Sequence, residues 1–168
     1  MNTYGWDLVF VTRGDVVNRS LAEHLQKTPV SVSYTEDNVS VAARFSSIQI
    51  VAGGGGKLIY FEMPVETGTI SLGDRKWKID GTEVIVELQL AFIDNADLSH
   101  VQDLRFHLAV AGKQVGDTTD GAVTLVKCLP GKGVDSSAAS AFSQHVVDCL
   151  LANRDQLAYV FAAINLQP

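Results

Sequence analysis

Four consecutive glycines, residues 53–56, precede Lys57, and glycine-rich loops that end in lysine hold nucleotide phosphates in many enzymes. Such a loop also needs a glycine further upstream and a Ser or Thr directly after the lysine to bind magnesium. Leu58 follows Lys57, and the upstream glycine is absent. Because the run lies between two segments of alternating hydrophobicity, we predict a flexible hairpin turn.

The histidines and cysteines do not have the spacing of a metal site. No two histidines are one helical turn apart, and the two cysteines are far apart in the chain. These residues are His24, His100, His107, His145, Cys128 and Cys149. A calcium loop is hinted at by Asp117, Asp120 and Gly121. The hint is weak, because Thr118 and Thr119 stand where a calcium loop needs its alternating oxygen ligands. We therefore predict no metal and no cofactor.

Signatures of nucleophilic catalysis are also missing. The sequence has no Gly-x-Ser-x-Gly elbow, and both cysteines lie in apolar segments, where the pKa of a thiol rises. Carboxylates are plentiful, as in any acidic protein, and no pair is distinguished by its spacing. We predict that the chain is not an enzyme and that it binds or assembles with something instead.

The composition limits the partners. The chain has 168 residues, 46% of them hydrophobic, and a formal net charge of −6, which predicts one domain with a sizeable core. Nucleic acid is not expected as a partner, because phosphate binding relies on clustered Lys and Arg. The densest basic cluster is Arg75, Lys76 and Lys78, which is either a solvated hairpin turn or a small patch for an anionic headgroup.

Targeting signals are not visible either. No segment has the ~20 apolar residues that span a bilayer, and no basic region precedes the apolar residues of the N-terminus. The unpaired cysteines indicate reduced thiols. These features predict a cytoplasmic location.

Two segments have the periodicity of amphipathic helices. In the first, Val17, Leu21 and Leu25 share a face, Asp15 is the predicted N-cap and Pro29 marks the end. The second is predicted to be capped by Ser136 or Ser137 and, after a break at residues 153–155, to continue as a further helical stretch. Its apolar residues are Phe142, Val146 and Leu150, followed by Leu157, Phe161 and Ile164.

Between residues 30 and 126, apolar and polar residues alternate as in strands with one buried face. Glycine-containing turns separate these segments, and no helical crossover fits between them, so we predict an antiparallel sheet. A sheet with one polar face must bury its other, apolar face. Only the two amphipathic helices are available to cover it. The predicted fold is α+β, with a long curved sheet wrapped around the C-terminal helix.

A gap between this sheet and the C-terminal helix would form an apolar groove. The residues predicted to face it come from two strands and the helix. They are Ile59, Phe61, Met63, Val86, Leu88, Leu90, Phe92, Phe142, Val146 and Leu150. Each of them is equally explained as part of a packed core.

The N-terminal residues Tyr4, Gly5, Trp6 and Asp7 form a compact motif, in which the indole of Trp6 can anchor the N-terminus and Asp7 can bond to nearby amides. Asn18, in the first helix, is predicted to tie that helix to the sheet by side-chain hydrogen bonds. Its loss should then reduce stability and leave binding unaffected.

This opening, together with the segment Trp77 to Thr82 and the strand that follows it, resembles the accessory proteins of clostridial neurotoxin gene clusters, namely the OrfX proteins and their forty-seven-kilodalton relative. The resemblance implies a tubular lipid-binding (TULIP) fold, in which a highly curved antiparallel sheet wraps a long helix. It also implies lipid as a ligand, since some members bind phosphoinositides. Here an inositide would have to use Arg75, Lys76 or Lys78.

The resemblance leaves two functions open. In the first, the chain is a lipid-binding accessory protein whose groove takes up acyl chains, and the resemblance implies that it is released with a toxin without a classical signal peptide. In the second, the domain is fully packed and works by docking to a toxin, to a second copy of itself or to a sister protein of the same fold. An elongated cavity would favour the first, and a filled interior the second.

Overall fold

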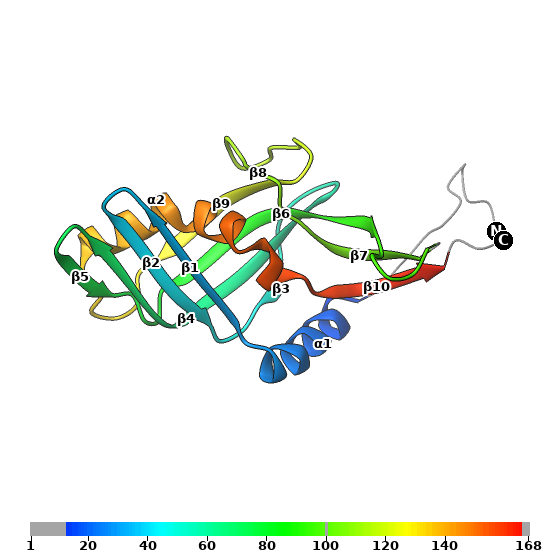
Figure 1. The fold of residues 1–168 in the computed structure, drawn as a ribbon, viewed down its shortest axis with the longest axis horizontal. Helices are drawn as coiled ribbons and strands as arrows, with labels where there is room; N and C mark the ends of the chain where they lie inside the picture. Colours follow the sequence, from blue (N-terminus) through cyan, green and yellow to red (C-terminus); the bar gives the residue numbers. More distant parts are fainter. Residues whose placement is uncertain (1–12, 100, 166–168) are drawn as a thin grey trace.

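The computed structural model describes residues 13–99 and 101–165. It contains two α-helices, one 3-10 helix and ten strands within this range (Figure 1). In chain order the elements are α1 (Gly14–Lys27), β1 (Val30–Glu36), β2 (Val39–Phe45), β3 (Gln49–Val51), β4 (Leu58–Leu72), β5 (Arg75–Lys78), β6 (Glu83–Asp94), β7 (Val101–His107), β8 (Val110–Ala111), β9 (Ala122–Leu129), α2 (Ser136–Ala152), η1 (Arg154–Leu157) and β10 (Val160–Asn165).

The ten strands form one curled sheet. Its main path runs β1-β2-β4-β6-β7-β10, with β3 and β5 paired to β4 and with β9 paired to β6. These pairs are antiparallel, as predicted. The exception is a two-residue parallel ladder between β8 and β9, in which Val110 lies opposite Ala122. The sequence did not predict this ladder, because it arises only when the loop after β8 returns the chain in its original direction.

Helix α2 lies along the concave side of the sheet. It contacts β1 and β2 on one side of the curl and β9 on the other, and also β4 (Figure 1). Phe142, Val146 and Leu150 are each at most 1% exposed and face the sheet, as the periodicity predicted. The predicted fold, a highly curved antiparallel sheet around a long helix with a second helix near the N-terminus, is confirmed.

The curl requires β4 to bend about halfway along its length. The register between β2 and β4 shifts near Phe45, so that residues 65 and 67 of β4 lie opposite adjacent residues of β2. Just beyond the shift, Ile79 packs directly over Gly68. A Cβ at Gly68 would lie 2.8 Å from Ile79 Cγ1, which is closer than side chains approach each other, so this crossing requires glycine.

The helix caps differ from the prediction. Arg13 precedes α1 without a side-chain cap, while Asp15 lies inside the first turn and pairs with Arg13 at 2.8 Å. At α2 the cap is Asp135, whose carboxylate accepts hydrogen bonds from the amides of the next turn, and not Ser136 or Ser137. In both cases the sequence offered several polar residues in a row, and only the backbone path decides which of them has the extended conformation of an N-cap.

The predicted helix after the break at residues 153–155 is wrong. One turn of 3-10 helix, η1, leads instead into strand β10, which pairs antiparallel with β7 so that Ala163 lies opposite Asp103. The run from Val160 to Ile164 contains no polar residue, so neither a period of 2 nor a period of 3.6 could be recognised in it. The free edge of β7 decides the outcome, because pairing there satisfies the backbone of both strands.

Asparagine side chains occupy the outer edges of two strands. Asn18 of α1 donates from Nδ2 to the carbonyl of Ile50 at 2.9 Å and accepts from its amide at 2.7 Å, so it ties helix to sheet as predicted. Asn153, after α2, makes the same pair of contacts with Ser33 of β1, at 2.7 and 3.2 Å. Each carboxamide takes the place of a neighbouring strand and covers an exposed edge.

Replacing Asn18 by Ala should lower the free energy of unfolding by about 1–2 kcal/mol, because two backbone groups of Ile50 lose their partners. Asn18→Asp should be similarly destabilising, since an ionised carboxylate cannot donate to the Ile50 carbonyl. Urea denaturation measures both. The matched control is Glu23→Ala on the exposed face of α1. Equal midpoints for Asn18→Ala and Glu23→Ala would show that the amide pair does not stabilise the protein.

Candidate functional site

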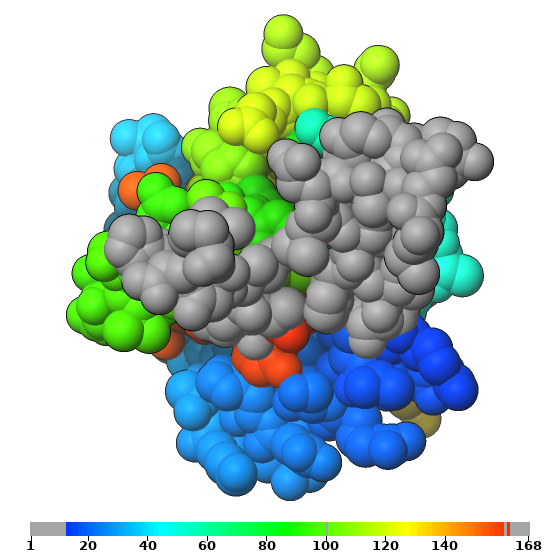
Figure 2. All heavy atoms as spheres, turned by 90° about the vertical axis from the view of Figure 1, so that its right-hand side faces the viewer, coloured from blue at the N-terminus to red at the C-terminus, as the bar shows by residue number. Residues whose placement is uncertain are grey.

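An apolar cleft lies between α1 and the sheet. Its volume is about 590 Å³. The residues that line it come from α1, β3, β4, β6, β7 and the start of the last strand. They are Gly14, Val16, Val17, Ser20, Ile50, Ile59, Leu90, Leu104, Tyr159 and Phe161. Figure 2 looks onto this end of the molecule, where α1 (blue) and the β6–β7 hairpin (green) lie to either side of the orange-red C-terminal strand.

One wall of the cleft is aromatic. The rings of Tyr159 and Phe161 meet edge to face with centroids 4.8 Å apart, and Phe161 meets Phe106 in the same way at 4.9 Å. Phe106 in turn packs on Phe61 at 4.7 Å, which joins the wall to the core. Such edge-to-face contacts hold rings in fixed orientations. The wall is therefore a preformed surface.

The cleft also contains one polar pair. The hydroxyls of Ser20 in α1 and Tyr159 lie 2.5 Å apart. The tyrosine ring is positioned from both sides, because its edge-to-face partners are Phe161 and His24, the latter with centroids 4.9 Å apart. No sequence pattern could have indicated this pair, since 139 residues separate its members.

The ten residues predicted to line a groove beside α2 are divided among three environments. Seven lie in the packed core with at most 3% of their surface exposed, and these are Phe61, Met63, Val86, Leu88, Phe142, Val146 and Leu150. Ile59 and Leu90 line the cleft beneath α1. Phe92 is 40% exposed and lies two residues beyond Leu90 on β6. The structure thus brings together only two of the ten residues in a cleft.

The predicted basic patch lies far from this cleft. Arg75, Lys76 and Lys78 are exposed on β5, at the opposite end of the long axis from β10 (Figure 1). β5 forms a hairpin with β4, and Lys78 lines a pocket together with Arg44 and Asp80. Residues 53–56 likewise form the turn of the β3–β4 hairpin. Tyr4, Gly5, Trp6 and Asp7 fall outside the described residues.

The remaining candidates for chemistry are the histidines and cysteines, of which His107 pairs with Asp120 at 3.1 Å. No group of three or more His, Cys, Asp or Glu side chains is arranged to hold a metal ion there. Burial, together with the nearby Asp148 carboxylate, raises the pKa of Cys149 to about 12, so its thiol stays protonated and unreactive at neutral pH. Neither helix in this range is long and apolar enough to cross a membrane.

The outward face of β6 is buried although its sequence is polar. Glu87 and Gln89 are 2% and 5% exposed, because the loop between β8 and β9 covers them. The amide of Gly116 donates to the Glu87 carboxylate at 2.6 Å, and Gln89 Nε2 donates to the carbonyl of Thr119 at 2.9 Å. The sequence signal was the same alternation that marks solvent-facing residues, so this burial was not predictable.

Asp117 organises that loop. Its carboxylate accepts from the backbone amides of Lys113 and Thr119, both at 2.9 Å. The hydrogen bond from Lys113, followed by those from Thr119, lowers the pKa of Asp117 to about 2. Both carboxylate oxygens are thus engaged with the loop backbone.

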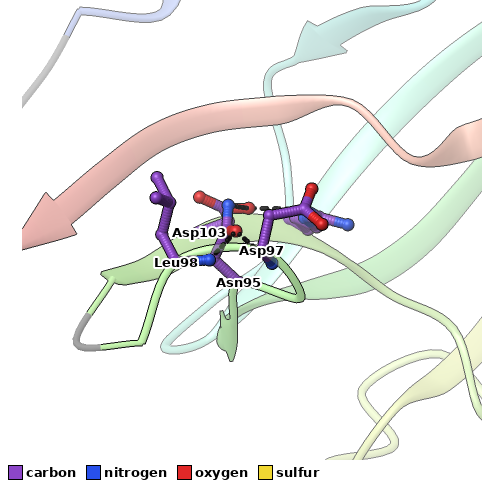
Figure 3. Close-up of polar contacts among 5 residues, drawn as sticks. Asn95, Asp97, Leu98 and Asp103 are labelled. Atoms are coloured by element: carbon purple, nitrogen blue, oxygen red, sulfur yellow. Dashed lines mark hydrogen bonds and ion pairs between the residues drawn. The ribbon is translucent and has the colours of Figure 1, made fainter.

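The described residues at the end of the β6–β7 hairpin are acidic and joined by hydrogen bonds. Asn95 Oδ1 accepts from the amides of Asp97 and Leu98, while its Nδ2 donates to the carboxylate of Asp103 at 2.9 Å (Figure 3). Asp103 is 2% exposed and also pairs with Arg105. This network fixes the turn, and Leu98 remains 57% exposed beside it.

The fold and the cleft define an α+β protein in which a curled sheet encloses one helix and leaves an apolar cleft beneath another. Residues 3–167 match the OrfX-like family, described as Protein OrfX2/OrfX3/P47, and the chain belongs to this family. Protein P47 of Clostridium botulinum (strain Kyoto / Type A2) is 23% identical over 168 residues, covering 99% of this chain and 39% of that protein. The resemblance seen in the sequence is confirmed.

Two solved structures share the fold. The structure of P47 from Clostridium botulinum A2 matches with a TM-score of 0.83 at 21% identity, over 99% of this chain and 39% of that one. The crystal structure of P47 of Clostridium botulinum E1 matches with a TM-score of 0.76 at 23% identity, over 98% and 37%. The chain thus spans about two-fifths of the length of these relatives.

The β8–β9 loop should respond to acid through Asp117. Because its folded-state pKa is lowered, the stabilising contribution of this group is complete above the ordinary Asp value near 3.9 and is lost as the pH falls toward 2. An NMR titration should find the Asp117 carboxyl with a midpoint near 2, with faster amide exchange at Lys113 and Thr119 below it. A midpoint at the ordinary Asp value would contradict these hydrogen bonds.

Proposed function

We propose that this chain is a non-enzymatic, lipid-binding accessory protein of a toxin gene cluster, with a TULIP-like fold, and that the acyl part of its ligand lies in the cleft beneath α1. The observation that carries the proposal is the cleft itself, with about 590 Å³ of space and apolar walls from α1 and the sheet. Pockets that bind small apolar ligands have volumes of roughly 300–1,000 Å³. Each buried methylene would contribute about 0.8 kcal/mol.

The proposal moves the ligand from the groove that the sequence suggested. Beside α2, Phe61 and Phe142 are fully buried and Leu88 is 3% exposed, so that region is already filled by protein side chains. Beneath α1, Ile59 and Leu90 of the same strands face open space instead. A ligand that enters the cleft covers apolar surface and leaves the packing of the core side chains unchanged.

A docking function is the second candidate, and the β6–β7 hairpin favours it. Phe92, Ile93 and Leu98 are 38–57% exposed near its end, next to Asp94 and Asp97. Exposed apolar residues near one end of a hairpin are typical of protein interfaces. The partner would be a sister protein of the same fold, a second copy or a toxin, with a surface of positive charge.

Replacing Leu90 by Trp should reduce lipid uptake at least ~tenfold. The indole fills cleft space in which about two methylene groups of the acyl chain would otherwise be buried. The fold should persist, since the new ring extends into the cleft; Leu88→Trp, by contrast, would overpack the core and destabilise it. Native mass spectrometry of protein incubated with phospholipid vesicles measures uptake, and circular dichroism checks the fold.

Leu98→Trp is the matched control, since it places the same ring on the exposed hairpin turn. It should take up lipid like the unmodified chain. If the unmodified chain takes up no lipid, the lipid-binding proposal fails and docking becomes the leading function. If Leu90→Trp takes up lipid normally, the ligand does not occupy this cleft.

A further inference from the structure

The walls of the cleft carry no charge in the part of the chain that the structure describes. Eight of its ten lining residues are glycine, aliphatic or phenylalanine, and the other two are Ser20 and Tyr159. Arg13, Arg19 and Arg105 each adjoin a lining residue along the chain, but none of them is part of the lining. Arg13 pairs with Asp15 through contacts of 3.0 and 2.8 Å, and Arg105 pairs with Asp103 at 2.5 Å. The exposed lysines of β5 lie at the other end of the molecule (Figure 1).

The Ser20–Tyr159 pair supplies hydrogen-bonding capacity beyond the contact between the two hydroxyls, as far as the described residues show. Each hydroxyl can donate one hydrogen bond and accept two. Whichever hydroxyl donates across the 2.5 Å contact, the proton of the other remains available. This proton can be donated to a hydroxyl, ester or ketone oxygen of a ligand, and the oxygens can accept from a ligand hydroxyl.

From this lining we infer that the cleft selects uncharged amphiphiles that carry a hydroxyl or ester group, such as a diacylglycerol, over phospholipids with a charged headgroup. A neutral head can enter with its acyl chains and bond to the Ser20–Tyr159 pair. A phosphodiester would lose hydration on approaching these walls and would find no cation among the described lining residues to compensate. The inference rests on the proposed function, because it names the class of ligand for the same cleft.

Phosphatidylcholine vesicles that contain equal minor fractions of diacylglycerol and phosphatidylserine, all with the same acyl chains, provide the test. The full chain is incubated with them and separated by size exclusion, and the bound lipids are extracted and quantified by mass spectrometry. We expect diacylglycerol to exceed phosphatidylserine at least ~fivefold in the protein fraction, the effect of about one hydrogen bond. Equal amounts, or an excess of either phospholipid relative to its share, would overturn the inference.

The double variant Ser20→Ala/Tyr159→Phe tests the assigned groups. It removes both hydroxyls and keeps the ring that packs on Phe161 and His24. Uptake of diacylglycerol should fall about fivefold, the cost of one lost hydrogen bond. Tyr34→Phe is the matched control, because the hydroxyl of Tyr34 bonds to Glu36 on β1, away from the cleft lining. It should behave like the unmodified chain.

The outcomes separate this inference from the proposed function. If the unmodified chain binds phospholipid as well as diacylglycerol, lipid binding stands and the selectivity is overturned. If the diacylglycerol excess survives in the double variant, the hydroxyl pair is not its cause and the assignment is overturned. If no lipid is bound at all, both proposals fail.

Discussion

The pairing of β4 along its whole length is the interaction on which the rest of the structure depends. Residues 58–64 pair with β3 and β6, and residues 65–72 pair with β2 and β5, so one continuous strand carries the sheet around α2. The bend between these halves needs both the register shift near Phe45 and the close passage of Ile79 over Gly68. Because backbone pairing must be satisfied on both sides of β4, the curl is fixed, and the positions of both helices follow from it.

The two helices serve different purposes as a consequence. Helix α2 lies inside the curl and fills it, so the side chains on its contact face are buried. Helix α1 lies against β3, where Asn18 holds it by the backbone of Ile50 and Leu21 and Leu25 are buried. Its first turn projects beyond these anchors, and the space beneath Val16 and Val17 remains open as the cleft. The proposed ligand site is thus a product of how α1 is attached.

Local periodicity explains which predictions succeeded. Phe142, Val146 and Leu150 repeat every four residues among smaller and polar neighbours, so their shared face was visible in the sequence. β10 was missed because its uniformly apolar residues carry no period, and its strand conformation depends on an edge of β7 that is distant in the chain. The burial of Glu87 was missed for a related reason, since a loop from residues 112–121 covers it.

The sequence by itself determined the class of fold, the apolar face of each strong element and the family, because these depend on neighbouring residues. Only the tertiary structure decided what each apolar face contacts. Ile59 and Phe61 lie on the same face of β4, two residues apart, yet Phe61 is fully buried while Ile59 lines the cleft. Likewise Ser20 and Tyr159 become a hydrogen-bonding pair only in the folded chain. The physical reason is that packing and cavities depend on contacts between residues far apart in the chain. The alternation of residues along one strand does not encode those contacts.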